Sequence, residues 1–164
     1  MKSILVLESS PRGDLSISKK LTQRVLKKLK SIHKDVEITI EDIALNPAPH
    51  LTISQMDSFF TQEMQRSVEQ KNIIQISDRY IEQLKKADIV IVSFPVWNFC
   101  IPSSLKAWLD QIVRVNETFQ YVGGFPEGLL KNKIVYLVLA RGGVYKDSFS
   151  IEDEDFFDFF NPLS

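Results

Sequence analysis

The hydrophobic positions of this chain fall into short continuous runs and longer runs at helical spacing. Continuous apolar runs rich in Val and Ile occupy residues 3–8, 88–94 and 133–140, whereas residues 36–42 alternate apolar and polar side chains. Continuous runs are typical of parallel strands covered on both faces, and alternation is typical of a half-exposed strand at a sheet edge. We therefore predict four strands, the second of them at an edge.

Helical periodicity fills the segments between these runs. A first helix carries one apolar stripe with members three or four residues apart: Ile17, Leu21, Val25, Leu29 and Ile32. Six lysines largely occupy the rest of that helix, and we predict a solvated face rather than a phosphate-binding patch: Lys19, Lys20, Lys27, Lys28, Lys30 and Lys34. An interrupted helical region spans residues 54–87, and a further helix runs from about Pro102 to Arg114.

The alternation of strands and helices predicts an α/β fold with a doubly wound parallel sheet. Of the known orders, 2-1-3-4-5 puts the second strand at an edge, which agrees with its alternating pattern. The same order places the fourth strand inside, beside a fifth strand that is not apparent here. Such sheets bind ligands beyond the carboxyl ends of their strands. The loops after strands one, three and four are therefore the candidate site.

The loop after the first strand is rich in hydroxyl groups. It reads SSPRGDLSIS over residues 9–18 and lacks both the G-x-G-x-x-G and the P-loop pattern. Hydroxyls and free backbone N–H groups at the start of a helix suit a phosphate monoester, because the helix dipole favours an anion. An equally weighted alternative is that Ser16 only caps the helix.

The other two loops suit a flat ring system. Residues 95–102 read PVWNFCIP, in which aromatic groups can cover the face of a ring while backbone N–H groups and an amide address its polar edge. Residues 140–145 read ARGGVY, and the paired glycines let the backbone approach a ligand closely. The alternatives are ordinary core aromatics and a plain turn, but the placement of these loops favours a site. Cys100 lies beside it, and we expect a buried or inert thiol.

Composition narrows the classes of function. The length of 164 residues suits one domain, and 44% hydrophobic with 25% charged residues is typical of soluble globular proteins. Lys+Arg 20 against Asp+Glu 21 leaves a net charge of −1, so no basic excess points to nucleic acid or a membrane surface. One Cys and two His argue against a disulfide and a metal site. With no signal peptide and no apolar window of ~20 residues, we expect a cytoplasmic protein.

In these loops the chain resembles the flavodoxin-like FMN-dependent NADH azoreductases, relatives of the NAD(P)H:quinone reductases. The matching pieces are SILVLESSPRGDLSISKKL, DIALNPAP, DIVIVSFPVWNFCIPSSLKAWLD, TFQYVGGFPEGLLKNK and ARGGVYKD. The resemblance implies FMN-phosphate contacts from Ser10, Ser16, Ser18 and the backbone of Ile17. It implies isoalloxazine contacts from Pro95, Val96, Trp97, Asn98 and Phe99, and contacts at the pyrimidine edge from Ala140, Arg141, Gly142 and Gly143. Family members commonly carry Ser where Ala140 stands, so one side-chain contact is not carried over.

The same resemblance implies a reaction. FMN would pass hydride from NADH or NADPH to quinones or azo compounds in a ping-pong cycle, with no obligatory catalytic side chain and no metal. The family usually works as a homodimer with the active site at the subunit interface. One alternative is a flavodoxin-like electron carrier, although such carriers are usually strongly acidic. Another is a flavin-free truncated relative that acts as a binding or structural protein.

The last segment of the chain departs from this pattern. Five of the 11 Phe lie in the last 16 residues, interleaved with acidic residues. A βα unit takes about half of a ~30-residue βαβ module, so the chain stops roughly one unit and a helix before the family pattern is complete. The fourth strand would then be an unpaired edge, which natural sheets avoid. We therefore expect residues 1–164 to be a single flavodoxin-like FMN-binding domain that is truncated at its C-terminus.

Overall fold

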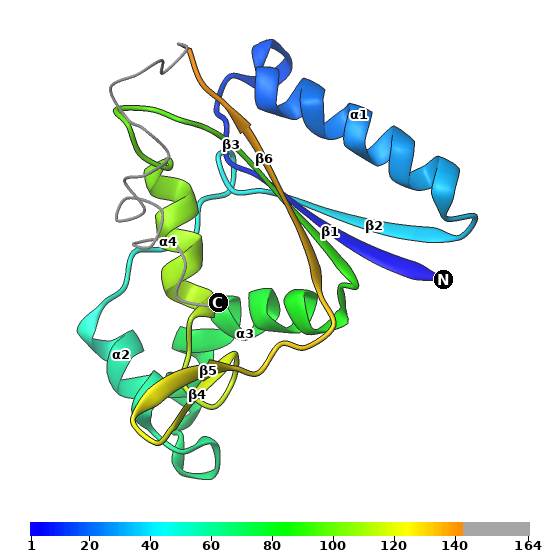
Figure 1. The fold of residues 1–164 in the computed structure, drawn as a ribbon. Coiled ribbons are helices and arrows are strands. Elements are labelled where there is room, and N and C mark those ends of the chain that lie inside the picture. Colours follow the sequence, from blue (N-terminus) through cyan, green and yellow to red (C-terminus); the bar gives the residue numbers. More distant parts are fainter. Residues whose placement is uncertain (143–164) are drawn as a thin grey trace.

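The computed structural model describes residues 1–142, which form a parallel sheet with helices on both faces (Figure 1). The strands of this sheet are β1 (Lys2–Glu8), β2 (Val36–Asp42), β3 (Ile89–Pro95) and β6 (Ile134–Ala140). They are all parallel and lie in the order β2-β1-β3-β6. The four predicted strands, their order and the edge position of the second are confirmed.

Four helices connect the strands of the sheet. They are α1 (Ile17–Ile32), α2 (Ile53–Phe60), α3 (Val68–Lys86) and α4 (Ser103–Ile112), with 3-10 turns η1 (Gly13–Leu15) and η2 (Glu63–Gln65). The break predicted within residues 54–87 separates α2 from α3. Each of these helices begins with a capping box, formed by Thr52 with Gln55 and by Ser67 with Gln70.

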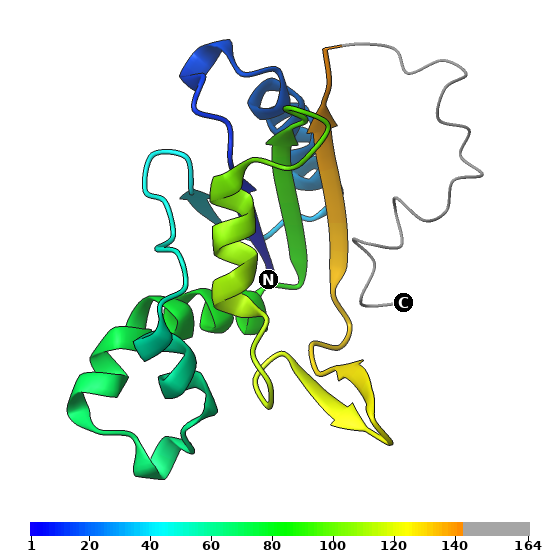
Figure 2. The same ribbon diagram turned by 90° about the vertical axis from the view of Figure 1, so that its left-hand side faces the viewer.

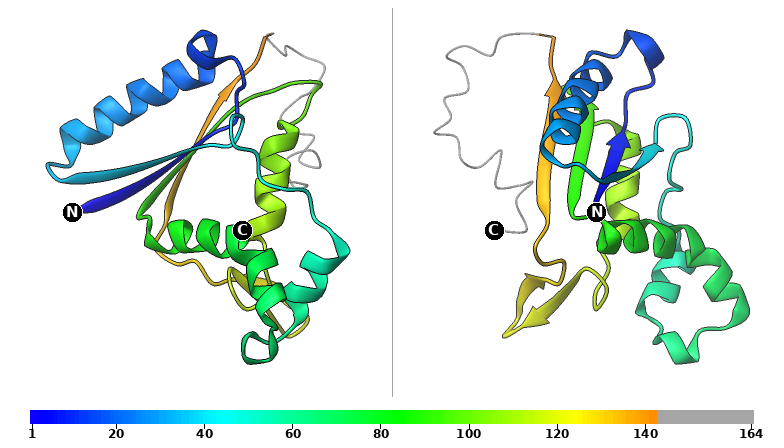
Figure 3. Two further views of the ribbon diagram at one scale, coloured as in Figure 1. Left: turned by 180° about the vertical axis from the view of Figure 1, so that it is seen from behind. Right: turned by 90° about the vertical axis from the view of Figure 1, so that its right-hand side faces the viewer.

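The alternation of side chains along β1 divides the core into two layers. Ile4 and Val6 point to one face, where they pack with Leu26 and Leu29 of α1. Leu5 and Leu7 belong to the opposite cluster, with side chains of α3 and α4. Figures 2 and 3 show the same division, with α1 on one side of the sheet and α3 and α4 on the other. Burying each such side chain contributes about 1.5–3 kcal/mol, so the sheet is held from both faces.

The apolar stripe predicted for α1 is partly wrong. Its ends, Ile17 and Ile32, are exposed, and Leu21 and Val25 are half-buried. The buried line of the helix consists of Ser18, Thr22, Leu26 and Leu29. Two of these are small polar residues, which let the amino-terminal half of α1 lie close to the sheet, and a hydrophobicity pattern alone does not detect them.

An antiparallel hairpin was not expected from the sequence. Strands β4 (Phe119–Val122) and β5 (Phe125–Gly128) pair through a two-residue turn, Gly123–Gly124, with φ values of 60° and 88°. Glycine is favoured in such a turn because both central residues need positive φ. In Figure 2 the hairpin projects from the end of the sheet opposite the carboxyl ends of the strands.

Strand β6 has one neighbour among residues 1–142, namely β3. Three of its apolar side chains, Ile134, Val135 and Leu137, are more than half exposed. Within the described part of the chain, β6 is thus the open edge expected for the fourth strand. The Phe-rich segment and Gly143 lie outside the described residues. No helix among residues 1–142 is long and apolar enough to cross a membrane.

Candidate functional site

Three loops meet at the carboxyl ends of the parallel strands. The backbone N–H and the hydroxyl of Ser9 both donate to the carbonyl of Ser93, each at 3.0 Å. The N–H of Val96 donates to the carbonyl of Ala140 at 2.8 Å. The loop after β1 therefore contacts β3, and the loop after β3 contacts the end of β6, at the upper end of the sheet in Figure 2.

The hydroxyl-rich loop carries three predicted serines, of which Ser16 and Ser18 lie at the start of α1 and Ser10 lies near the end of β1. Ser10, Ser16 and Ser18 are all buried, and the hydroxyls of Ser16 and Ser18 lie 3.1 Å apart. Ser16 also accepts a hydrogen bond from the N–H of Lys19 at 3.2 Å, so its role as helix cap is confirmed. The first amides of a helix, here those of Ile17 and Ser18, have no acceptor within the helix. Ser16 can therefore cap the helix while the amides of Ile17 and Ser18 stay available for an anion.

The aromatic loop ends in a tight turn that holds its rings outward. Trp97 and Cys100 exchange backbone hydrogen bonds of 3.1 and 3.0 Å, and φ is 50° at Asn98 and 63° at Phe99. Trp97 is 41% exposed and Phe99 is 68% exposed, which excludes the alternative that they are core residues. For the thiol predicted to be buried or inert, burial is wrong, because Cys100 is exposed on this turn, and inertness stays a prediction.

Positive φ at Phe99 stores strain that a pair of substitutions can measure. We expect Phe99→Gly to be more stable than Phe99→Ala by about 1 kcal/mol, since only glycine adopts this conformation without strain. Both variants lose the ring, so their difference reports the backbone alone. Guanidinium unfolding of the two proteins measures it. The order should reverse at Phe125, an exposed strand residue without positive φ, where glycine costs about 0.5–1 kcal/mol relative to alanine. Equal stability of the pair at residue 99 would contradict a strained turn.

A pocket of about 220 Å³ lies among the loops after β1, β2 and β3 and the start of α4. It is lined by Ser9, Pro11, Ala44, Trp97, Pro102, Ser103 and Ser104. The sequence did not indicate Ala44 or the two serines at the start of α4 as site residues. The DIALNPAP segment was the nearest signal for Ala44, which it places in the loop after β2, and the two serines directly follow the PVWNFCIP segment. Ser93, whose hydroxyl is buried without a hydrogen-bond partner among the described residues, lies under this pocket through its contact with Ser9.

Among the predicted site residues that the structure describes, Trp97 alone lines this pocket. Pro95 and Val96 lead from β3 toward Trp97, and Ala140 is paired with Pro95 across the sheet. Arg141 and Gly142 follow β6 and are exposed. The structure thus brings the predicted residues of loops one, three and four to one end of the sheet, with Gly143 outside the described residues.

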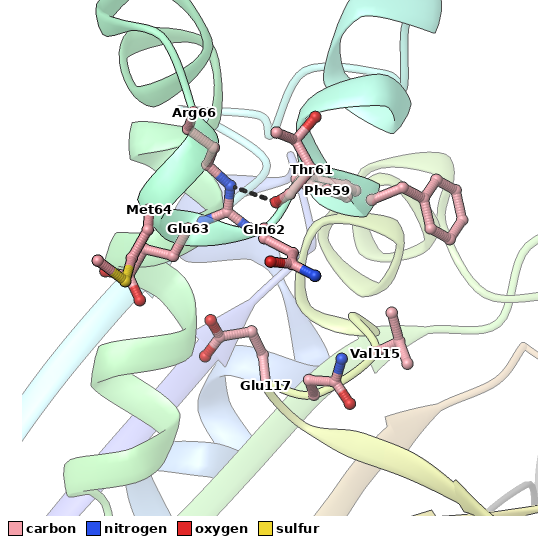
Figure 4. A pocket seen from close by; sticks show the side chains of 10 residues that line it. Phe59, Thr61, Gln62, Glu63, Met64, Arg66, Val115 and Glu117 are labelled. Atoms are coloured by element: carbon pink, nitrogen blue, oxygen red, sulfur yellow. Dashed lines mark hydrogen bonds between the residues drawn. The ribbon is translucent and has the colours of Figure 1, made fainter.

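A larger cavity, of about 590 Å³, lies elsewhere (Figure 4). It is lined by residues 59–64, Arg66 and residues 115–117, beyond the carboxyl end of α4, whereas the smaller pocket lies at the beginning of that helix. Two of its three charged side chains, Arg66 and Glu117, already have partners. Arg66 donates to the carbonyls of Ser58 and Thr61, each at 3.0 Å, and Glu117 pairs with Lys85 at 2.7 Å. No group of three or more potential metal ligands gathers among residues 1–142. We therefore place the candidate site at the smaller pocket.

Comparisons with known proteins show what this chain is similar to. A profile described as a flavodoxin-like fold matches residues 2–161. FMN-dependent NADH:quinone oxidoreductase 2 of Pseudomonas fluorescens is 38% identical over 156 residues, which cover 95% of this chain and 78% of that protein. FMN-dependent NADH:quinone oxidoreductase of Azotobacter vinelandii is 39% identical over 148 residues, covering 90% and 74%. The crystal structure of an azoreductase from Bacillus anthracis superposes with a TM-score of 0.85 at 25% identity, covering 100% of this chain and 82% of that one.

Proposed function

Because this chain belongs to the family of flavodoxin-like fold proteins, we propose that it is an FMN-dependent oxidoreductase. Its proposed reaction takes hydride from NADH or NADPH and reduces small flat acceptors, quinones or azo compounds. The names of its relatives support FMN, NADH and quinone, and azoreductase is the name of a structural neighbour. A cytoplasmic location stays a prediction.

One observation carries this proposal: the hydroxyl-rich loop and the exposed indole border a single pocket. Ser9 and Trp97 line it together, and Ser16 and Ser18 lie at the helix start that follows the same loop. FMN has two parts, a phosphate and a flat ring. The phosphate would bind at the amino end of α1, and the ring would lie against Trp97. The buried hydroxyls, the helix start and the exposed aromatic face therefore fit this cofactor.

We propose a role in FMN binding for each predicted residue. Ser10, Ser16, Ser18 and the N–H of Ile17 would bind the phosphate. Val96 and Pro95 would hold the ring edge through their backbone, with Trp97, Asn98 and Phe99 against the ring. Ala140, Arg141, Gly142 and Gly143 would approach its pyrimidine edge.

When bound, FMN would supply the hydride-transfer chemistry. The protein would bind and orient the nicotinamide and the acceptor, both flat, over the flavin ring. Because the two would occupy the same position one after the other, we propose a ping-pong cycle. Trp97 and Phe99 are exposed, so a second subunit packed over this edge would shield the slot from water. We therefore propose a homodimer with the active site at the interface.

An absorption spectrum of the gently purified protein tests the proposal. We expect a yellow protein with flavin bands that bleach when NADH or NADPH is added and return when a quinone is supplied. Flavin that neither nicotinamide reduces would instead support an electron carrier. A colourless protein that does not take up added FMN would support a flavin-free binding protein and refute both flavin functions.

A further inference from the structure

Lys19 does not belong to the solvated lysine face predicted for α1. Its side chain is only 17% exposed, and its Nζ lies 3.2 Å from Oε2 of Glu8 and donates a hydrogen bond to Asp42. Partial burial by itself lowers the pKa of the Lys19 ammonium, but the hydrogen bonds to Asp42 and Glu8 outweigh it and the pKa is raised. The neighbouring Lys20 is exposed. One lysine of the six thus points into the protein.

The two carboxylates lie at the ends of adjacent strands. Glu8 is the last residue of β1, and its side chain is 9% exposed. Asp42 is the last residue of β2, and its Oδ1 accepts hydrogen bonds from the N–H groups of Ala44 and Leu45, both at 3.1 Å. Ala44 lines the candidate pocket. The Glu8–Lys19–Asp42 cluster therefore connects the loop after β2 to the start of α1.

The same cluster closes the proposed phosphate loop. Glu8 directly precedes this loop, residues 9–18, and Lys19 directly follows it, so their ion pair joins the two ends. The N–H of Lys19 also donates to Ser16 inside the loop. Fixing both ends reduces the number of conformations that must be ordered when a ligand binds.

Lys19 also compensates the negative charges of Glu8 and Asp42. Without it, two poorly solvated carboxylates would stand beside a loop proposed to bind a phosphate, and like charges in such surroundings repel strongly. The ammonium neutralises one negative charge and lies between both carboxylates. An aliphatic side chain of the same length would fill the space but leave both charges uncompensated.

We infer that Lys19 is a positioning residue for phosphate binding: it shields the anion from Glu8 and Asp42 and holds both ends of the loop in place. The inference rests on the proposed function, because it assumes that this loop takes the phosphate of FMN. Lys19 itself need not touch the phosphate.

The test compares FMN with riboflavin, which has the same ring but no phosphate. Dissociation constants of both are measured by fluorescence titration of flavin-stripped protein. We expect Lys19→Met to weaken FMN binding about tenfold and to leave riboflavin binding nearly unchanged. Lys20→Met, which removes the same charge from the neighbouring exposed position, should change neither constant. Lys19→Arg keeps the cation and should retain most of the FMN affinity.

Each other outcome separates the inference from the proposed function. Equal losses for FMN and riboflavin, or no loss of either, would overturn the inference while leaving an FMN protein. Wild-type protein that binds neither flavin would refute the proposed function itself. If Lys19→Met does not fold, Glu8→Gln gives the answer, because it removes one negative charge and keeps a hydrogen-bonding side chain. It should tighten FMN binding roughly two- to fivefold and not riboflavin binding, and unchanged or weaker FMN binding would overturn the inference.

Discussion

Replacing Trp97 by alanine is expected to weaken FMN binding by about 1–3 kcal/mol, or roughly 5–150-fold in the dissociation constant. The indole stands at the head of a tight turn and lines the pocket beside Ser9, with 41% of its surface still exposed. A flavin stacked on it would bury much of that surface, and alanine would leave the ring one face short. Fluorescence titration of flavin-stripped protein measures the change.

Two controls make this loss specific to the ring platform. Trp97→Phe keeps an aromatic face and should recover most of the FMN affinity. If Trp97 did not stack on the ring, Trp97→Ala and Trp97→Phe would bind FMN about equally well. The midpoint of unfolding of the flavin-free Trp97→Ala protein should stay close to that of the wild type, because the indole is exposed and belongs to neither core cluster. Unchanged FMN affinity in Trp97→Ala would mean that the ring lies elsewhere.

Much of the sheet is predictable from the sequence because its signals are local. Residues 3–8 and 88–94 are apolar on both faces, and a strand with that pattern has to be covered by helices on both sides. The alternation in residues 36–42 is likewise set by one exposed face. Once the strand order follows, the loops at the carboxyl ends are defined without any knowledge of side-chain positions. The grouping of the serine loop with the aromatic loop comes from this topology alone.

Features that depend on distant partners are not predictable in this way. Lys19 is one of five lysines on α1, and only the fold brings Glu8 and Asp42 to it. The exposure of Cys100 depends on positive φ at Phe99, a residue type that does not signal such a turn. The opposite holds for the hairpin, since the pair Gly123 and Gly124 between Phe119–Val122 and Phe125–Gly128 is a local signal of a two-residue turn.

Arg114 is the clearest case of a residue whose importance only the fold reveals. It follows α4, and its side chain is 2% exposed. One guanidinium nitrogen donates to the hydroxyl of Ser77 at 2.9 Å and to Asp78 at 2.5 Å, and the guanidinium carbon lies 4.6 Å above the ring centre of Phe59. These contacts connect the end of α4 to α2 and α3. In the sequence, Arg114 is only the last residue of a predicted helix.

Replacing Arg114 by methionine is therefore expected to lower the free energy of unfolding by about 2–4 kcal/mol, measured by guanidinium denaturation. Methionine fills part of the space of the stem but supplies neither the hydrogen bonds nor the stacking on Phe59. The Nε of Arg114 is buried without a hydrogen-bond partner among the described residues. The wild-type side chain therefore carries a desolvation cost that offsets part of the stabilisation from its other contacts. For this reason the expected loss stays below the largest values known for buried charges.

The matched control is Asp78→Asn, which removes the charge of the partner and keeps its shape. Asp78 is 49% exposed, so water already stabilises it, and the expected loss is less than about 1 kcal/mol. A loss in Asp78→Asn as large as that in Arg114→Met would show that the ion pair, and not the other contacts of the buried guanidinium, holds the helices together. Arg114 lies at the end of α4 opposite Pro102 and the candidate pocket, so the folded fraction of Arg114→Met should bind FMN as the wild type does. Weaker FMN binding by that folded fraction would mean that the packing of α2 and α3 against α4 also sets the position of the aromatic loop.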